Sequence, residues 1–233
     1  MRLDKYLSHI GIGTRTEVKK IVSENRVKVN EKVANKPSIN INPDVDKILL
    51  NNELLEYKEF YYFILNKPQG VITATDDNVH KTVMDLLKKE DKNKNIFPVG
   101  RLDKDTEGLL ILTNNGQLSH NLLSPKKHVS KTYCLKTIGS IVPDAIERFK
   151  SGIEFKDGIK CLPAKLEFIN KDELLITIQE GKFHQVKRMV HHIGGEVVYL
   201  KRIQIGNLKL PMDLDPGEYR ELTNNELNLI LND

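Results

Sequence analysis

Short stretches of regular hydrophobic spacing fill the N-terminal part of the chain. Apolar side chains three and four positions apart predict an amphipathic helix over residues 2–10. Thr14 and Glu17 have the spacing of a capping box, which predicts the start of a second helix. The alternating residues 27–30 and the apolar runs within residues 48–55 predict short strands. We therefore expect a small domain of two helices and a few strands.

Strand-like and helix-like patterns mix along the rest of the chain. Apolar and β-branched runs predict strands at residues 60–65, 71–75, 109–112, 131–137 and 197–210, with two more between residues 162 and 180. Helical spacing predicts helices at residues 81–90, 117–123, 143–150 and 185–193, and a last one capped by Thr223 and Glu226. Because these elements do not alternate strictly, we predict an α+β fold whose mostly antiparallel mixed sheet is flanked by helices, rather than a doubly wound fold.

A charged segment, Glu56 to Glu59, separates these two regions and is typical of a linker. We therefore predict a small domain over residues 1–58 and a larger one over residues 59–233. Within the larger domain, the proline and glycine of Asn66 to Gly70 predict a turn.

The composition is that of an ordinary soluble globular protein, with 39% hydrophobic and 29% charged residues among 233. No apolar run approaches the roughly 18 residues that span a bilayer, so we expect no membrane segment. The N-terminus lacks the apolar core of a signal peptide, which favours a cytoplasmic protein. Cys134 and Cys161 have no CxxC partner, and we expect both to be reduced thiols.

Positive charge is concentrated at the N-terminus. Residues 1–36 hold nine lysines and arginines against four acids, a net charge of +5, which leaves −1 for the rest of the chain. A basic module on a near-neutral body is typical of a nucleic-acid-binding domain. A solvated charged surface explains the same count equally well.

A cluster of charges directly precedes the most apolar run of the chain. Arg101, Asp103, Lys104, Asp105 and Glu107 stand before the leucine-rich residues 109–112. Charged groups at the edge of a buried strand are costly unless they are paired or used. A carboxylate held beside a cation at such a place is a candidate nucleophile or general base.

The familiar cofactor motifs are missing from the sequence. It contains no GxxxxGK[ST], no GxGxxG and no GxSxG segment. His184, His191 and His192 do not have the spacing of a helical pair of metal ligands, and no cysteine lies near them. We therefore expect no metal site and no cofactor.

Two cations stand in the first turn of the helix predicted at residues 185–193. Lys187 and Arg188 occupy a position where the helix dipole favours anions. Their placement indicates that they interact with a negatively charged partner, such as phosphates or a carboxylate like Asp103. A cationic surface patch is the plainer interpretation.

Together these segments resemble the RsuA/RluA-type pseudouridine synthases. Gly100-Arg101-Leu102-Asp103, with Asp105-Thr106 and Gly108-Leu109-Leu110, looks like the catalytic motif of that family. Four other motifs match in order: Asn66-Lys67-Pro68 with Gly70; Ser124-Pro125 with Lys131-Thr132-Tyr133; Glu180-Gly181-Lys182 with His184-Gln185-Val186-Lys187-Arg188-Met189; and Pro216-Gly217-Glu218-Tyr219-Arg220 with Leu222-Thr223. The first 58 residues, beginning Arg2-Leu3-Asp4-Lys5-Tyr6-Leu7, resemble an S4 RNA-binding domain.

The resemblance implies an enzyme that converts a uridine in RNA to pseudouridine without a cofactor. The S4-like domain points to the RsuA branch. The residues of three segments are most similar to its small-subunit rRNA enzymes: Ser124-Pro125, Lys131-Thr132-Tyr133 and His184-Gln185-Val186-Lys187-Arg188-Met189. The implied partner is 16S rRNA or a small-subunit assembly intermediate, bound by a monomer. A sister enzyme acting on 23S rRNA is the first alternative, and a non-catalytic S4-type RNA-binding or ribosome-assembly protein is the second.

The resemblance also assigns roles to single residues. Asp103 becomes the essential carboxylate, Lys187 its counter-cation at a position the family more often fills with arginine, and Tyr133 the ring that stacks on the uracil. Ile205 and Leu208 are equal candidates for an apolar wall beneath the base. The residues expected to contact RNA are Arg2, Lys5, Arg15, Lys19, Lys20, Arg26, Lys28, Lys67, Arg101 and Arg188.

Overall fold

The structure is a computed structural model that describes residues 1–231 of the chain. These residues form two compact units. The first comprises Met1–Tyr61 together with the segments Leu87–Phe97 and Thr113–Asn115, and the second holds the remainder. Asp103 and the charged cluster around it therefore lie in the second unit.

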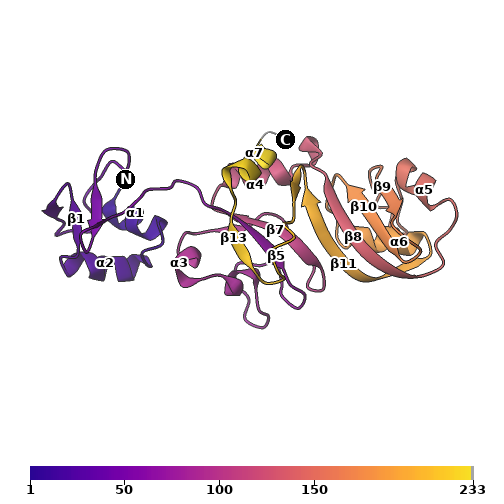
Figure 1. Ribbon diagram of the computed structural model, residues 1–233, viewed down its shortest axis with the longest axis horizontal. Coiled ribbons are helices and arrows are strands. Elements are labelled where there is room, and N and C mark those ends of the chain that lie inside the picture. Colours follow the sequence, from indigo (N-terminus) through magenta and orange to yellow (C-terminus); the bar gives the residue numbers. More distant parts are fainter. Residues whose placement is uncertain (232–233) are drawn as a thin grey trace. The chain divides into compact units, whose positions relative to one another are not determined.

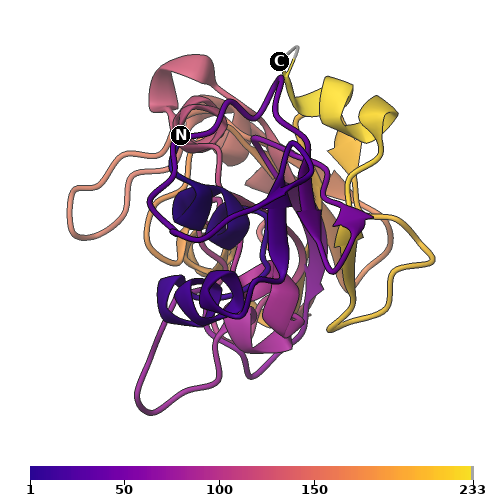
Figure 2. The ribbon, with the colours of Figure 1, turned by 90° about the vertical axis from the view of Figure 1, so that its left-hand side faces the viewer.

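The first unit is built on a small antiparallel sheet. Its strands β1 (Val27–Val29), β2 (Lys32–Val33), β3 (Ile48–Leu50) and β4 (Glu53–Leu54) follow the order β2-β1-β3-β4. Helices α1 (Leu3–His9) and α2 (Arg15–Ser23), in indigo, lie beside each other on one side of this sheet (Figure 2). The short helix α3 (Lys89–Lys92) belongs to the same unit. The predicted pair of helices with a few strands is confirmed.

The packing of this unit follows its hydrophobic spacing. Leu3, Tyr6 and Leu7 on α1 are at most 2% exposed and pack with Val18 and Val22 of α2. The capping box predicted for α2 is present. The backbone N–H of Thr14 donates to the Glu17 carboxylate at 2.8 Å, and the N–H of Glu17 donates to the Thr14 hydroxyl at 3.3 Å.

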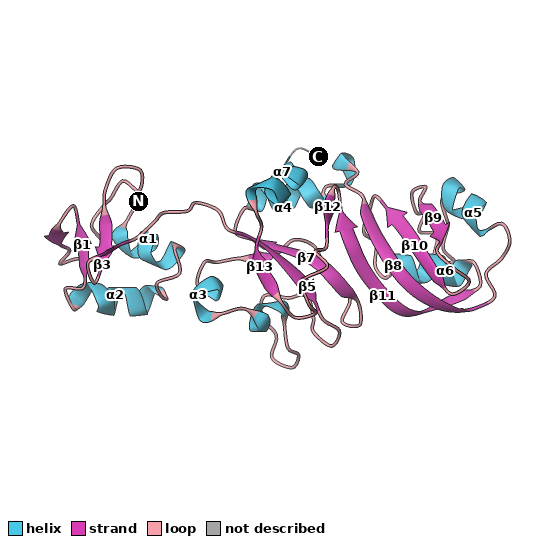
Figure 3. Cartoon of the chain, viewed as in Figure 1, coloured by secondary structure: helices cyan, strands magenta, loops and turns pink. Residues whose placement is uncertain are grey.

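The second unit is organised around one long sheet (Figures 1 and 3). The strand order is β13-β5-β7-β11-β8-β10-β9, while β12 pairs with β11 and β6 with β7. The parallel pair β7–β11 adjoins antiparallel partners, which confirms the predicted α+β class with a mixed sheet. The strands are β5 (Tyr62–Lys67), β6 (Phe97–Pro98), β7 (Glu107–Thr113), β8 (Lys131–Gly139), β9 (Lys165–Phe168), β10 (Glu173–Ile178), β11 (Gly195–Ile205), β12 (Leu208–Lys209) and β13 (Tyr219–Glu221).

Helices flank this sheet. Those of the second unit are α4 (Gly116–Leu123), α5 (Ala145–Ser151), α6 (Gln185–His192) and α7 (Asn224–Leu231), with 3₁₀ turns at Val83–Leu86 and Pro125–Lys127. Leu118 and Leu122 of α4 and Ile230 of α7 pack on a core that includes Leu109 and Ile111 of β7. No helix in residues 1–231 has the length and apolarity needed to cross a membrane.

β7 is the strand on which the candidate motif rests. Its residues from Leu109 to Leu112 are 0% exposed, as their apolar character predicted. Burying each such side chain contributes roughly 1.5–3 kcal/mol relative to leaving it in water. This burial anchors the chain directly after the charged cluster and fixes where the preceding loop begins and ends.

Three predicted elements differ from the structure. Residues 71–75 form no strand, because Ile72 makes only an isolated bridge, to Thr82. The helix predicted over residues 81–90 is instead a 3₁₀ turn followed by α3, since the backbone and hydroxyl of Thr82 both donate to Asp85 and close a tight turn. The predicted turn at residues 66–70 begins later, because Asn66 and Lys67 still belong to β5.

Candidate active site

Asp103 lies in the loop between β6 and β7. The residue before it, Leu102, is held through both its backbone N–H and its backbone carbonyl. The hydroxyl of Thr73 donates to the Leu102 carbonyl at 2.8 Å, and the Leu102 N–H donates back to that hydroxyl at 3.1 Å. The Thr106 N–H then bonds to the Asp103 carbonyl at 3.1 Å and closes a turn. Asp103 thus stands between two anchored residues, with its side chain one-third exposed.

Lys67 holds the far side of the same loop from inside the protein. Its side chain is 0% exposed, and its ammonium donates to the carbonyls of Pro68 at 2.9 Å, Thr106 at 2.8 Å and Lys104 at 3.4 Å. The prediction that Lys67 contacts the RNA backbone is therefore wrong. β5 carries this lysine into the core, where it supports the turn that follows Asp103.

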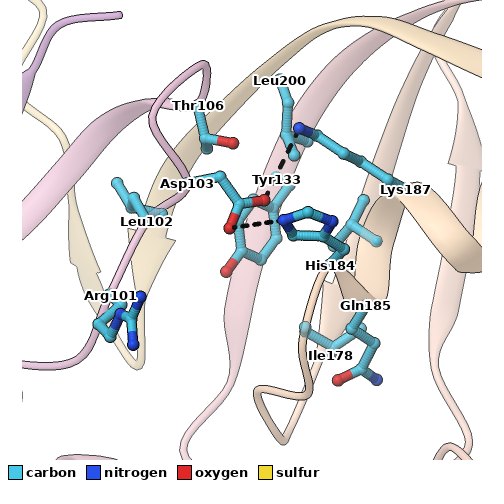
Figure 4. A pocket seen from close by; sticks show the side chains of 11 residues that line it. Arg101, Leu102, Asp103, Thr106, Tyr133, Ile178, His184, Gln185, Lys187 and Leu200 are labelled. Atoms are coloured by element: carbon cyan, nitrogen blue, oxygen red, sulfur yellow. Dashed lines mark ion pairs between the residues drawn. The ribbon is translucent and has the colours of Figure 1, made fainter. Parts of the chain in front are cut away.

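Two basic side chains from the start of α6 face Asp103 (Figure 4). Lys187 Nζ lies 3.7 Å from Asp103 Oδ2, and His184 Nε2 lies 3.7 Å from Oδ1. Both distances are within ion-pair range and too long for hydrogen bonds. His184 adopts a left-handed backbone conformation with φ +50°, which a non-glycine residue holds only when its surroundings fix it.

Lys187 bridges two carboxylates. Its closest contacts are to Asp105, at 2.6 and 2.7 Å to the two oxygens. Partial burial acts to raise the pKa of the Asp105 carboxyl, but the hydrogen bonds and charge of Lys187 outweigh it and hold that pKa below its usual value. The predicted counter-cation therefore does approach Asp103, but it bonds more closely to the neighbouring acid.

Tyr133 enters the same pocket from β8. Its ring is 8% exposed and lies behind the Asp103 carboxylate in the view of Figure 4. Leu102, Ile178 and Leu200 supply the apolar lining. A carboxylate with basic side chains on one side and an aromatic ring with apolar walls on the other can receive a flat, partly polar ring.

The apolar wall comes from a residue that the sequence did not single out. Ile205 and Leu208 are 3% and 1% exposed and belong to the core, so neither lines the pocket. Leu200 does, because it pairs across the sheet with Leu135, two residues beyond Tyr133 on the same face. Only the register between β8 and β11 reveals this neighbour.

Two buried cations lie on the sheet next to Tyr133. Lys131 precedes it by two residues on β8, and Arg202 stands opposite it on β11. The Arg202 Nε–H donates to the Leu109 carbonyl at 2.8 Å, whereas its Nη2 has no hydrogen-bond partner within residues 1–231. Burial and the charge of Arg202 lower the pKa of Lys131 to about 8. No acidic side chain of the described chain pairs with either cation.

One further polar atom in the pocket has no partner. Thr106 lines the pocket, and its hydroxyl is buried without a hydrogen bond to any residue in the described range. Buried hydroxyls are normally satisfied, so this one is available to a bound molecule. Nothing in its sequence position distinguishes it from a structural threonine.

Arg101 and Arg188 have different surroundings. Arg101 is exposed at the edge of the pocket, and no carboxylate of residues 1–231 lies within ion-pair distance of it. Arg188 instead pairs with Asp157 at 2.6 Å and lies over the ring of Phe155 at 3.9 Å. The two cations of the first turn of α6 thus both have carboxylate partners within the protein.

The other candidate RNA contacts lie in the first unit. Lys5 and the α2 side chains Arg15, Lys19 and Lys20 are exposed, with no ion pair to any described residue. Three more have polar neighbours: Arg2 bonds to both oxygens of Asp4, Arg26 to Asn51 and Glu24, and Lys28 to Asn52. The exposed side chains on α2 are therefore the freest to bind phosphates.

The reactive groups of the pocket are an aspartate, a lysine, a histidine and a tyrosine. No cluster of three or more His, Cys, Asp or Glu side chains within residues 1–231 has the geometry to hold a metal ion. The arrangement suits reactions in which a positioned carboxylate attacks a substrate or removes its proton.

Two family models match the chain. The model described as RNA pseudouridylate synthase matches residues 61–192, and the S4 domain model matches residues 1–46. The first match spans more than half of the chain and contains Asp103, Tyr133 and Lys187.

Several relatives are similar along almost the whole chain. The "Uncharacterized RNA pseudouridine synthase YtzG" of Bacillus subtilis is 47% identical over 99% of this chain and 98% of its own length. The "Ribosomal small subunit pseudouridine synthase A" of Escherichia coli is 39% identical, with 97% and 98% covered, and the "Ribosomal large subunit pseudouridine synthase B" of Bacillus subtilis is 38% identical, with 97% and 93% covered. A solved structure described as "Crystal structure of pseudouridylate synthase" aligns over 99% of both chains with a TM-score of 0.70 and 36% identity.

Proposed function

The chain belongs to the RNA pseudouridine synthase family, and we propose that within this family it modifies a uridine of small-subunit (16S) ribosomal RNA. The similarity to a small-subunit synthase extends over nearly the full length of both chains, S4 domain included. The large-subunit synthase is almost as similar, so this choice of target is the part of the proposal that an experiment has to decide.

The observation that carries the catalytic assignment is the pocket around Asp103. Pseudouridine formation breaks the bond between N1 and C1′, turns the uracil and joins C5 to C1′. One hydrogen leaves C5 and one is gained at N1, so the reaction is an isomerisation. Asp103 supplies the carboxylate that acts on the nucleoside, and it is the carboxylate that both Lys187 and His184 approach.

The other pocket residues position the nucleoside and the carboxylate. The uridine leaves its stack to reach Asp103, as in other enzymes that act on bases. Tyr133 stacks on the uracil, a contact worth roughly 1–3 kcal/mol. Leu200 forms the apolar wall, and the unpartnered hydroxyl of Thr106 is placed to bond to the base or its ribose. Lys187 is a positioning residue, since it fixes Asp103 and Asp105 together.

RNA outside the pocket is held by charge. Arg101, at the pocket edge without an ion pair, contacts the phosphate backbone or fills the space left by the flipped base. Arg15, Lys19 and Lys20 of the S4 domain contact phosphates, which gives affinity and salt dependence but little choice of sequence. The proposal places the enzyme, as a monomer, in the cytoplasm, acting on 16S rRNA or on a small-subunit assembly intermediate.

Mapping pseudouridine in ribosomal RNA tests this proposal. Cells that lack the protein should lose one pseudouridine of 16S rRNA, and the wild-type gene should restore it whereas Asp103→Asn should not. Loss of a 23S rRNA pseudouridine instead would show that the target is the large subunit. An unchanged pattern in both rRNAs would contradict the proposed substrate.

A further inference from the structure

A second and larger groove adjoins the Asp103 pocket. It has a volume of about 810 Å3 and shares His184 and Lys187 with that pocket. Its volume lies within the range of ligand-binding clefts. We call it the α6 groove, and its lining residues are Asp105, Phe155, Lys156, His184, Lys187, Arg188, His191, His192, Glu196 and Val197. Because the pocket and the groove share His184 and Lys187, an RNA strand whose base reaches Asp103 can continue past His184 into this groove.

Donors and positive charge remain available in the groove after the internal ion pairs are counted. Lys187 is occupied by Asp105 and Arg188 by Asp157. Lys156, His191 and His192 are exposed, and none of their side chains has a hydrogen bond or ion pair to another residue of the described chain. An ammonium with two imidazoles beside it is a set of donors suited to phosphate oxygens.

An exposed aromatic ring contacts His184, which lines both the Asp103 pocket and the α6 groove. Phe183 is 76% exposed, and its ring stacks on that of His184 with centroids 3.8 Å apart and planes 19° from parallel. His184 in turn reaches Asp103, as the dashed line in Figure 4 shows. The stacked pair thus leads from the catalytic carboxylate to solvent and offers an open ring face on which a base can stack.

Basic groups along a groove combined with an exposed aromatic ring are the features that bind single-stranded nucleic acid. On the basis of the proposed function, we propose that the α6 groove binds the unpaired nucleotides that flank the target uridine. A flanking base stacks on Phe183, and the adjoining phosphates bond to Lys156, His191 and His192. The groove then holds the strand in the distorted path that the flipped uridine requires.

Binding of two RNA probes to the full-length protein tests this inference. The probes are a fluorescent single-stranded oligouridylate and a blunt RNA duplex of equal length. Phe183→Leu removes the ring face while keeping apolar bulk, and we expect it to raise the Kd for the oligouridylate on the order of tenfold and leave duplex binding unchanged. Phe183→Tyr keeps the ring and should bind like the wild type. Met212→Ala, at a fully exposed apolar residue outside the groove, is the matched control.

The phosphate contacts have their own variant. Replacing Lys156, His191 and His192 with glutamine should weaken oligouridylate binding and raise the KM for rRNA more than it lowers kcat. Lys171→Gln, at an exposed turn away from the groove, should change neither quantity. Unchanged oligouridylate binding in both groove variants would overturn the inference, and so would an equal loss for Phe183→Leu and Phe183→Tyr.

The two proposals fail in different ways. A wild-type protein that forms no pseudouridine in any rRNA would refute the proposed function. A wild-type protein that does form it, while the groove variants keep its KM and its affinity for oligouridylate, would refute the groove alone.

Discussion

Lys187 is the side chain that connects the two acids of the pocket. It lies 3.7 Å from Asp103 and bonds to Asp105 at 2.6 Å, so its removal leaves both carboxylates without the cation that they share. A nearby cation favours the ionised form of a carboxyl group, so losing Lys187 disfavours ionisation at both positions. The sequence predicted the partnership with Asp103 through the family resemblance, but the tighter bond to Asp105 follows only from the position of α6.

We therefore expect Lys187→Met to slow pseudouridine formation by roughly 10- to 100-fold, the size of one lost charge-assisted contact. Lys187→Arg should recover most of the rate, because it restores the charge. Single-turnover kinetics with saturating enzyme measure the effect, and Lys126→Met, at an exposed lysine outside the pocket, is the control. A wild-type rate for Lys187→Met would show that Asp103 needs no cation.

Lys131 makes stability depend on pH. Burial and Arg202 lower its pKa to about 8, against about 10.5 for a lysine in water. Between these values the unfolded chain binds the proton and the folded protein has released it. The unfolded state therefore holds more protons, and the contribution of Lys131 to the free energy of unfolding rises with pH.

Comparison with Lys131→Met isolates this contribution. The difference in unfolding free energy, wild type minus Lys131→Met, should be nearly constant below about pH 7.5. It should then increase by up to about 1.4 kcal/mol for each pH unit between about 8 and 10. Urea unfolding at several pH values measures it. A difference that stays flat up to pH 10 would mean that Lys131 is protonated in the folded protein throughout.

At the scale of elements, sequence patterns predicted where strands and helices lie better than they predicted which residues contact each other. The apolar run at residues 109–112 is β7, and the capping boxes at Thr14 and Thr223 do begin helices. Residues 71–75 have equally strand-like composition but face no partner strand, so they stay irregular. The residues around Lys67 predict a turn at the surface, whereas in the structure Lys67 is the last residue of β5 and is buried. Which strands pair and how deeply a side chain is buried depend on the whole sheet, so a local sequence pattern does not predict them.

The pairing of β7 with β11 depends on Gly108. Its φ is +107°, and a Cβ atom would lie 2.2 Å from the Arg202 carbonyl oxygen. Gly70 also has a positive φ, +82°, but nothing lies within 4 Å of its Cβ position. A substitution at Gly70 therefore has only the conformational cost of a side chain at positive φ, whereas one at Gly108 also has the cost of a steric clash.

Gly70→Ala should lower the free energy of unfolding by about 1 kcal/mol, the conformational cost alone. Gly108→Ala should cost more than about 3 kcal/mol, because the strands must also move apart. Chemical denaturation of both variants measures these losses. Equal losses would show that β11 can retreat from β7 without penalty.

At the scale of the whole molecule, the predicted combination of an S4 domain with a pseudouridine synthase domain is confirmed by the family matches and by a similar solved structure. The assignment rested on motifs in order rather than on charge, because a basic N-terminus alone fits a solvated surface equally well. The family resemblance predicted that Asp103, Tyr133 and Lys187 share one site. The places of Thr106, His184 and Leu200 in that site are known only from the fold.

Charge on the S4 domain should set the salt dependence of binding. Each phosphate contact contributes roughly 0.7–0.9 to the slope of log affinity against log salt concentration. Replacing Arg15, Lys19 and Lys20 with glutamine should therefore reduce that slope by up to about 2–3 and weaken binding to rRNA. A titration of affinity against salt measures it, with Lys171→Gln as control. An unchanged slope would mean that α2 does not contact RNA.

In the proposed reaction, Asp103 performs the chemistry on a uridine that the rest of the protein binds. Tritium release from rRNA labelled at C5 of uridine measures this role of Asp103, since joining C5 to C1′ displaces that hydrogen. Wild-type protein should release tritium, whereas Asp103→Asn should release none and still bind the rRNA with nearly the same Kd. Tritium release by Asp103→Asn at the wild-type rate, or loss of RNA binding together with activity, would show that Asp103 does not perform the chemistry.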